Sequence, residues 1–476
     1  MSEQGANQLG ALSEAELELA AEVAGRVEDL RGWASYVWDH PELAHQERRS
    51  AACLAQAIRA DGGFDVEMGP AGLETAFVAR TERAATPVVA YLAEYDALPA
   101  MSNVAEPRRA PVAPGAPGHG CHHHLLGAAS VLAGLSLRQH LASSDELSPG
   151  AIWIVGCPAE EADGGKIQLL REGAFAGVDF AVAWHPEETT FVCRGGSLAL
   201  ITLSVSFRGR ASHAAIAPHL GRSALDAALS FMQGLEFLRE HLPDGARIHY
   251  VLRRGGAQPN VVPDHAEVEV YLRAKTVGEV EHMLQRLGHV ARGADRMAWT
   301  DWYGDAEAGY RPPEVVVDSA YWPTLHNRTA SAVLERILAG LGPIPFLGQD
   351  HDEAREFQQA LGVDPVGLDG TAVSTPEAAA IGSSDVGDLS WNVPLVELNA
   401  ATLPVGIPVH SWAAVGCGKR EFAFKGALRA AQAMAVMGYR YLCEERLRRK
   451  IADEFDHTTA GVEWRTSAGT RLTLTP

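Results

Sequence analysis

The sequence predicts an α/β fold, in which a larger domain with a central mixed sheet is interrupted by a smaller α+β domain of two layers. Short apolar strands alternate with helices up to residue 197 and again after residue 312, and this alternation is typical of α/β domains. Between these parts, the order strand, helix, strand, strand, helix suits a small two-layer domain. We therefore expect segments 1–197, 198–311 and 312–476, with the first and third forming one domain.

The first segment should begin with two helices. Ser13–Asp39 reads as an amphipathic helix in which Ser13 and Glu16 form a capping box. Arg48–Ala60 reads as a second helix, which ends at Asp61-Gly62-Gly63. Apolar runs bounded by Gly and Pro then predict strands Phe64–Met68, Thr75–Val78, Val88–Leu92, Ala151–Gly156 and Phe180–Trp184. Helices are expected among them at His124–His140 and Lys166–Glu172.

The pattern changes near Leu198, where SLALITLSVSFRG alternates like an amphipathic strand. The remaining elements expected in the inserted segment are helix Ser223–His241, strands Ile248–Arg253 and Val262–Ala274, and helix Val277–Ala291. After residue 312 we expect a helix at Thr329–Leu338, a long helix at Gly426–Phe455 and a tail over the last twenty residues.

Composition excludes some partners. The formal net charge of -20 argues against binding to nucleic acid or to an anionic membrane. No run of 18 apolar residues is present, and the acidic start of the chain lacks the basic and apolar blocks of a signal peptide. The six cysteines are scattered without CxxC pairs, which favours reduced thiols. We expect a cytoplasmic protein that acts on a small molecule.

Three expected strands end in side chains that bind metals or move protons. VVAYLAEYDALP delivers Glu94 and Asp96, the next strand runs into GCPAEEADGGK, and the third ends at His185. Open α/β sheets place their sites at the carboxyl ends of their strands. The stretch PGHGCHHHLLGAAS adds a cluster that includes Cys121 and His123. If this stretch is extended, residues two apart point to the same side, so these two could share one zinc or manganese ion.

Each of these features also has a structural interpretation. Glu160 and Glu161 could be exposed loop acids, His185 a hydrogen-bonded core histidine and His410 a surface histidine. Adjacent carboxylates diverge, however, so one could bind a metal while the other acts as general base toward a water. The combined set has the composition of a mono- or binuclear hydrolytic site, and it comprises Cys121, His123, Glu161, His185 and His410.

Motifs along the chain carry a family likeness. In order they are EYDALP, GHGCxHxLLG, GCPAEE, WHP, SHAAxAPHLGRSALDA, QPNVVP, GSSDVGD and PxHSW. From about Arg31 to Glu454 the chain resembles the amidohydrolases of the aminoacylase and glutamate-carboxypeptidase superfamily, and most of all the aminobenzoyl-glutamate utilisation protein B group. The resemblance implies a metallopeptidase-like catalytic domain, with residues 198–311 as a lid and dimerisation domain. A homodimer is therefore expected.

The resemblance also implies roles for particular residues. Cys121, His123, Glu161, His185 and His410 would ligate one or two divalent ions per subunit, manganese or zinc. Glu160 would be the general base that activates water and then protonates the leaving nitrogen. Asp96 would orient His123.

Further implied roles fall in the inserted domain. His213 would enter the partner subunit's site, and Asn260 and Arg273 would bind substrate. Two of these have structural alternatives, because Asn260 could cap a turn before Pro263 and Arg273 could form an ion pair on a strand face.

The chain departs from the related group at two positions, since GHGCGHNLLG is usual there and this chain reads GHGCHHHLLG. His122 replaces a glycine that would allow close packing or an unusual backbone angle, and His124 replaces an asparagine. Both could contact substrate, so the departure affects substrate choice.

Three functions follow from the resemblance. The first is hydrolysis of an aryl amide such as p-aminobenzoyl-glutamate. The second is hydrolytic deamination of an amino-aromatic acid with release of ammonia, as by 5-nitroanthranilic acid aminohydrolase in the same superfamily. The third is a non-catalytic role beside a homologous second subunit.

Overall fold

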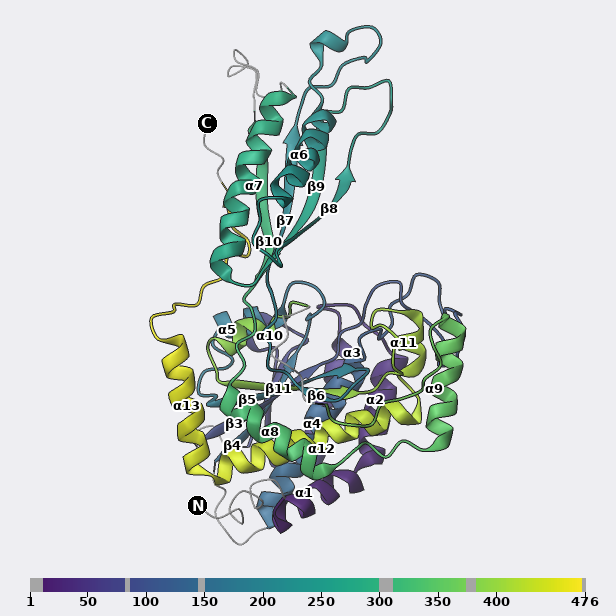
Figure 1. Ribbon diagram of the computed structural model, residues 1–476, viewed down its shortest axis with the longest axis vertical. Helices are drawn as coiled ribbons and strands as arrows, with labels where there is room; N and C mark the ends of the chain where they lie inside the picture. Colours follow the sequence, from purple (N-terminus) through teal and green to yellow (C-terminus); the bar gives the residue numbers. More distant parts are fainter. Residues whose placement is uncertain (1–11, 82–85, 144–149, 299–310, 374–381, 473–476) are drawn as a thin grey trace. The chain divides into compact units, whose positions relative to one another are not determined.

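The computed structural model describes residues 12–81, 86–143, 150–298, 311–373 and 382–472. The chain forms two compact units (Figure 1). Unit 1 comprises Met1–Gly195, Leu325–Ala378 and Leu389–Val462, and unit 2 comprises Gly196–Thr324, Ala379–Asp388 and Glu463–Pro476. In the described part of the chain, no helix combines the length and apolar composition needed to cross a bilayer.

Unit 1 is built on a seven-stranded mixed sheet in the order β1-β2-β4-β3-β5-β11-β6. The four central strands β4, β3, β5 and β11 are parallel, while β1, β2 and β6 pair antiparallel. The predicted α/β class with a mixed sheet is therefore confirmed. Strand bounds are β1 Asp65–Met68, β2 Phe77–Arg80, β3 Val88–Glu94, β4 Ala151–Cys157, β5 Phe180–Glu187, β6 Phe191–Val192 and β11 Leu395–Ala401.

Helices α4 and α12 form the centre of the unit 1 core, where they pack against each other and against β3 and β5. A Cβ on Gly127 of α4 would lie 2.5 Å from the carbonyl oxygen of Glu94. Glycine therefore lets the start of α4 approach the carboxyl end of β3. The helices of unit 1 are α1 Glu14–Gly25, α2 Val27–Asp39, α3 Arg48–Asp61, η2 Pro70–Gly72, α4 His123–Ser143, α5 Gly165–Arg171, α8 Arg328–Leu341, α9 Gly348–Leu361, α11 Trp412–Cys417, α12 Glu421–Cys443 and α13 Glu445–Thr459.

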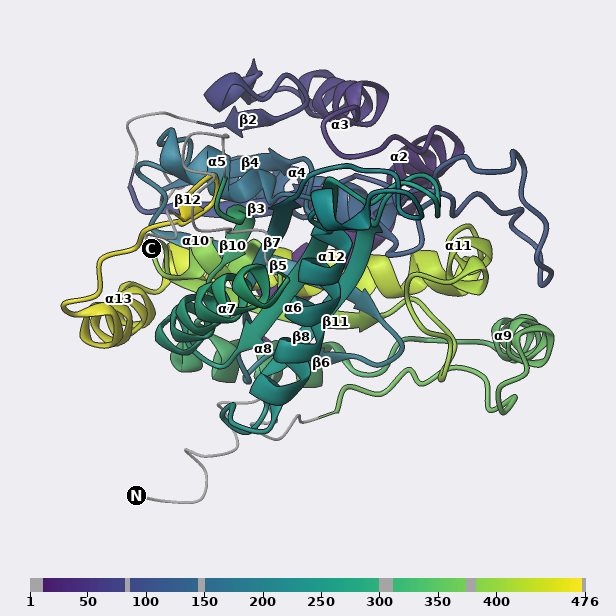
Figure 2. The same ribbon diagram turned by 90° about the horizontal axis from the view of Figure 1, so that it is seen from above.

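Unit 2 has a five-stranded antiparallel sheet in the order β12-β10-β7-β9-β8, with its own apolar core. Helices α6 and α7 lie side by side against this sheet (Figure 2). The elements are β7 Ala199–Arg208, η3 Pro218–Leu220, α6 Ala224–Arg239, β8 Arg247–Arg254, β9 His265–Ala274, α7 Val277–Met297, β10 Glu314–Tyr321 and β12 Arg471–Leu472, and α10 Val386–Ser390 spans the passage back to unit 1.

Two predicted helices are divided in the structure. The expected helix Ser13–Asp39 has the predicted capping box of Ser13 and Glu16 but breaks at Arg26. The expected helix Gly426–Phe455 breaks at Glu444, whose backbone is extended. Arg448 donates to the carbonyls of Tyr441 (3.0 Å) and Leu442 (2.6 Å), which α12 leaves free at its end.

The end of the chain is not a simple tail, so that prediction is wrong. Residues 457–459 complete α13, and β12 pairs with β10 in unit 2. Strand β10 begins just after the expected boundary at residue 311 and pairs with β7. Asp388 accepts hydrogen bonds from Trp322 N (3.0 Å) and Trp464 Nε1 (2.8 Å). These long-range contacts leave no local sequence signal, which is why the segment looked unstructured.

Candidate metal centre

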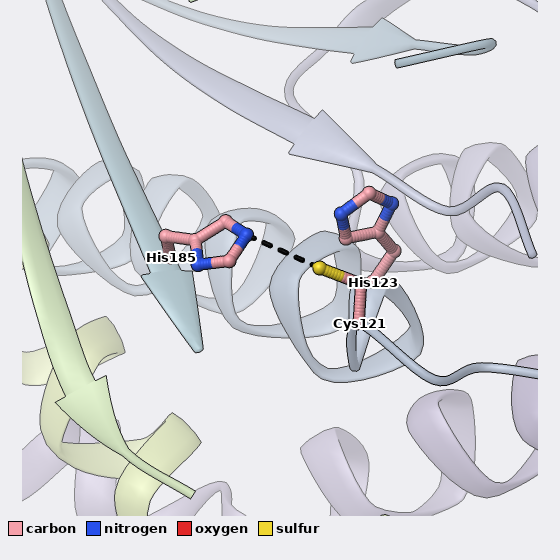
Figure 3. A group of neighbouring side chains, drawn as sticks. All are labelled: Cys121, His123 and His185. Atoms are coloured by element: carbon pink, nitrogen blue, oxygen red, sulfur yellow. Dashed lines mark hydrogen bonds between the residues drawn. The ribbon is translucent and has the colours of Figure 1, made fainter. Parts of the chain in front are cut away.

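Cys121, His123 and His185 come together at the carboxyl ends of the parallel strands. Their ligand atoms lie within 4.8 Å of one another, and Cys121 Sγ is 3.3 Å from His185 Nε2 (Figure 3). His185 lies on β5, and His123 is the first residue of α4. The stretch between Cys121 and His123 is a turn rather than the extended segment we considered, because His122 has a φ of 60°. The turn nevertheless directs both neighbours toward His185.

Asp96 connects two of the expected ligands. His123 Nδ1 lies 2.8 Å from Asp96 Oδ1, and the backbone N–H of Glu161 donates to Asp96 Oδ2 at 2.9 Å. The carboxylate is fully buried, so both contacts are shielded from water. Asp96 therefore fixes the ring of His123, with Nε2 toward the cluster, and the backbone position of Glu161.

Glu161 and His410 form the other side of the cluster. With Cys121 they constitute a second group whose ligand atoms lie within 4.8 Å, and His410 Nε2 is 3.2 Å from Glu161 Oε1. Burial raises the pKa of Glu161, but His410 and His123 oppose it and hold the pKa at about 2. His410 has a φ of 60°, and its N–H donates to Gly120 O at 2.9 Å. All five expected ligands thus meet in unit 1.

Glu160 lies beside this set. Its carboxylate, that of Glu94 and an imidazole nitrogen of His123 lie within 4.8 Å of one another. Glu94 in turn pairs with the fully buried ammonium of Lys166 at 2.6 Å. Burial raises the pKa of Glu94, but the charges of Lys166 and His123 and the hydrogen bond from Lys166 together lower it below its usual value.

Sequence reasoning placed Glu94 at a strand end without giving it a role, and it missed Lys166. The signal for Glu94 was its spacing of two residues from Asp96.

The donor set fits a divalent transition metal. His123 Nε2 is buried and makes no hydrogen bond within the described residues. One thiol, three imidazoles and one carboxylate are the ligand types of zinc and of similar ions. Burial, followed by the charge of His123, lowers the pKa of His185 to about 4, so this ring is neutral at pH 7 and able to ligate.

The two substituted histidines point elsewhere. His122 Nε2 lies 2.6 Å from Ala414 O and its Nδ1 lies 3.1 Å from Thr402 Oγ1, while His124 Nε2 lies 2.8 Å from Gly418 O. Both rings are fully buried. Neither belongs to the metal-ligating groups, and they connect the start of α4 to the α11 region. The structure therefore does not bring these two predicted substrate-binding residues together with the ligands.

The predicted residues of unit 2 separate into two places. His213 and Asn260 are both exposed. They are neighbours, because the backbone of His213 forms an antiparallel β-bridge with Val261 and Ala214 N donates to Asn260 O at 2.9 Å. Arg273 lies near the carboxyl end of β9, eight residues beyond His265, which begins the strand. At roughly 3.3 Å per residue, this separates Arg273 from His265 by about 26 Å. There it donates to Ser383 Oγ at 2.7 Å. Arg273 thus does not share a site with the other two inside this unit.

Comparison with known proteins gives consistent matches. Residues 196–294 match the family described as a peptidase dimerisation domain. The chain is 34% identical to one of the subunits of the p-aminobenzoyl-glutamate hydrolase of Escherichia coli over 453 residues, which are 90% of this chain and 92% of that protein. It is also 34% identical to the Xaa-Arg dipeptidase of Mus musculus, over 60% of this chain and 65% of that one.

Solved structures share the fold. An aminobenzoyl-glutamate utilisation protein from Klebsiella pneumoniae has a TM-score of 0.60 at 19% identity, covering 88% of this chain and 98% of its own. A dinuclear metal-binding peptidase of the M20 family from Bacillus subtilis has a TM-score of 0.55 at 19% identity, with the same coverage.

Proposed function

Because this chain belongs to the M20 peptidase family and is a metal-dependent hydrolase, we propose that it cleaves the amide bond of an N-acyl amino acid. The favoured substrate class is an aryl amide of the p-aminobenzoyl-glutamate type. The observation that carries the proposal is the buried ligand set with the carboxylate of Glu160 beside it. The likeness to the Escherichia coli hydrolase over nine-tenths of the chain supports the aryl amide.

Different residues would bind the metal and transfer the proton during hydrolysis. Cys121, His123, Glu161, His185 and His410 would hold one or two divalent ions, with manganese and zinc as the candidates. A bound ion of this kind lowers the pKa of water and polarises a carbonyl oxygen. Glu160 accepts the proton from the attacking water and delivers it to the leaving nitrogen.

Asp96 keeps the proton of His123 on Nδ1, so that Nε2 remains available as a ligand. Lys166 neutralises Glu94 and limits the negative charge that surrounds Glu160.

The dimerisation domain supports a second part of the proposal. A homodimer would form through unit 2, and its exposed His213 and Asn260 would contact the scissile group and the substrate carboxylate in the partner's site. Pairing with a homologous second chain is the alternative, since two different relatives of this chain are named as subunits B and A of the p-aminobenzoyl-glutamate hydrolase of Escherichia coli.

The other two functions have less support. Deamination was considered because His122 and His124 alter the sequence beside the ligands, and both rings are engaged with carbonyls of the α11 region. A non-catalytic chain would be expected to lack ligands or the base, and this chain has Glu160 and every expected ligand type in one cluster.

Product identification tests the proposal. The manganese- or zinc-loaded protein would be incubated with N-aroyl and N-acyl amino acids and with aminobenzoic acids, including nitro-substituted ones, and the products identified by mass spectrometry. We expect release of a free amino acid, fastest from the aryl amide, and none from a Glu160→Gln chain. Ammonia with a hydroxyaryl product would instead establish deamination. No product from metal-loaded protein would contradict autonomous catalysis and favour the role of a non-catalytic partner.

A further inference from the structure

A second group of metal-ligating side chains lies elsewhere in unit 1. Cys193, His326 and Glu397 offer a sulfur, a ring nitrogen and a carboxylate oxygen within 4.8 Å of one another. They share no residue with the ligands of the first centre. The segments that carry them, at β6, before α8 and in β11, pack side by side (Figure 1).

Backbone hydrogen bonds hold these three segments in register. Cys193 directly follows β6, and its N–H donates to Glu397 O at 2.9 Å, which extends the antiparallel β6–β11 ladder. Cys193 and Glu397 are therefore opposite each other, and such pairs project to one face of a sheet with neighbouring side chains. Asn327 N donates to Leu395 O at 3.1 Å, which fixes the adjacent His326 against the same strand. The geometry is thus set by main chain and does not depend on flexible loops.

The side chains are poorly satisfied without an ion. His326 Nδ1 is buried and makes no hydrogen bond within the described residues. The thiol of Cys193 makes a long contact of 3.7 Å with Asn399 Oδ1. Burial, then the charge of Glu94, raises the pKa of Glu397 to about 7, and burial lowers the pKa of His326 to about 4. The neutral imidazole can bind a cation directly, whereas the carboxyl of Glu397 and the thiol of Cys193, whose pKa burial also raises, must lose their protons when the ion binds.

We propose that Cys193, His326 and Glu397 form a second metal site that takes a divalent ion of the zinc class. A sulfur, a nitrogen and an oxygen ligand match zinc, which leaves a fourth position for water. When the ion binds, the thiol of Cys193 loses its proton to solvent and becomes the thiolate ligand. All three residues are partly exposed, although His326 Nδ1 itself is buried.

The position of the site indicates a structural role. Cys193 lies two residues before the chain leaves unit 1 at Gly195, and His326 follows Leu325, where the chain returns. An ion at this site would connect the segment that leaves unit 1 and the segment that returns to it, and would hold both against β11. The site is independent of the proposed function, because none of its residues takes part in the proposed reaction.

Cobalt substitution of the full-length protein tests the site. A thiolate bound to Co²⁺ gives a charge-transfer absorption in the near ultraviolet, but Cys121 could produce the same band. We therefore use a Cys121→Ser chain, stripped with chelator and titrated with CoCl₂, and expect it to retain the band. Adding Cys193→Ser should abolish the band, whereas adding Cys53→Ser, a half-buried cysteine outside both sites, should not. Absence of the band from Cys121→Ser, or its persistence after Cys193→Ser, would overturn the proposal.

Zinc stoichiometry provides a measurement without a cysteine change. In an otherwise unaltered chain, Glu397→Gln keeps the side-chain shape and should weaken zinc binding at the proposed site at least tenfold. At a free zinc concentration that fills this site in the unaltered chain but not in the variant, the variant should bind one ion fewer per chain. Glu353→Gln, a partly buried carboxyl on α9 in unit 1, is the matched control and should bind as the unaltered chain does. Far-ultraviolet circular dichroism confirms that each variant folds. Equal zinc binding by Glu397→Gln and the unaltered chain would contradict the site whether or not the enzyme shows amidase activity.

Discussion

The predicted site residues of unit 1 and those of unit 2 are placed very differently. In unit 1, side chains from five separate stretches meet in one cluster, where Asp96 fixes His123 and Glu161. In unit 2, His213 and Asn260 are exposed, and Arg273 is a strand's length away. Unit 1 therefore brings its expected metal ligands together by itself, whereas the unit 2 residues would need a substrate or another chain to form the proposed site.

The largest expected effect comes from Glu160. Glu160→Gln keeps the side-chain shape but removes the proton acceptor, so we expect kcat to fall by about 10²- to 10⁴-fold. Metal content should stay unchanged, because Glu161 is the expected carboxylate ligand. Steady-state kinetics on the best aryl amide, together with metal analysis, measures both. Glu172→Gln, an exposed carboxyl of the same unit, serves as control. Undiminished turnover of Glu160→Gln would falsify the general-base role.

Asp96 should control metal affinity. Asp96→Asn weakens the contacts to His123 and to the backbone of Glu161, so we expect affinity for zinc to fall about 10- to 100-fold. Titration against a chromogenic chelator gives this value. Asp163→Asn, which alters an exposed carboxyl paired with His45, should have no effect. If zinc binding by Asp96→Asn equalled that of the unaltered chain, the cluster would not depend on this carboxylate.

The contrast between the units also explains which parts of the site could be predicted from the sequence. The meeting of the expected ligands of unit 1 could be predicted because Glu94, the Glu160-Glu161 pair and His185 lie at or near the carboxyl ends of buried strands, and parallel strands bring such ends together. Strand β11 was missed, although it pairs with β5 and prolines stand on both sides of it, because the polar residues Glu397 and Asn399 interrupt its apolar run. The position of Glu397 opposite Cys193 follows from the antiparallel pairing of β6 with β11, so the second cluster could not be predicted.

Other failures concern backbone geometry and distant partners. The glycine that the related group has at position 122 was a signal for a turn, but a histidine with positive φ is uncommon, so an extended segment was considered instead. That His122 and His124 would bond carbonyls of the α11 region depends on contacts about 290 residues away in sequence. For Arg273 the sequence left substrate contact and a strand-face ion pair open, and its observed contact with Ser383 is neither of these.

Mixing two defective chains tests whether unit 2 completes a partner's site. If His213 acts in the partner's site, then a Glu160→Gln chain and a His213→Ala chain should form hybrid dimers that contain one intact site. Equal mixing with free exchange should restore about a quarter of the normal activity, since half of the dimers are hybrids and each has one working site of two. Activity assays after co-refolding measure this. Mixing Glu160→Gln with a Glu160→Gln chain is the control and should restore nothing. No recovery from the hybrid would contradict action in trans.

The smallest expected effect separates His122 from the ligands on either side of it. His122→Gly and His122→Ala both remove the ring and its bonds to Thr402 and Ala414, but only alanine keeps a Cβ at a φ of 60°. We therefore expect the alanine variant to be less stable than the glycine variant by about 1 kcal/mol in the free energy of unfolding. Urea denaturation measures the difference.

A position with ordinary helical backbone provides the control for this pair. Ala52 is exposed within α3, so Ala52→Gly should lower the free energy of unfolding by about 1 kcal/mol, which is the opposite order of alanine and glycine. Zinc affinity should not change in either His122 variant, because its ring contributes no atom to the ligand groups. A tenfold loss of zinc affinity in both would instead make His122 part of the metal centre. In that case it would be wrong to separate His122 and His124, which contact the α11 region, from the expected ligands Cys121 and His123.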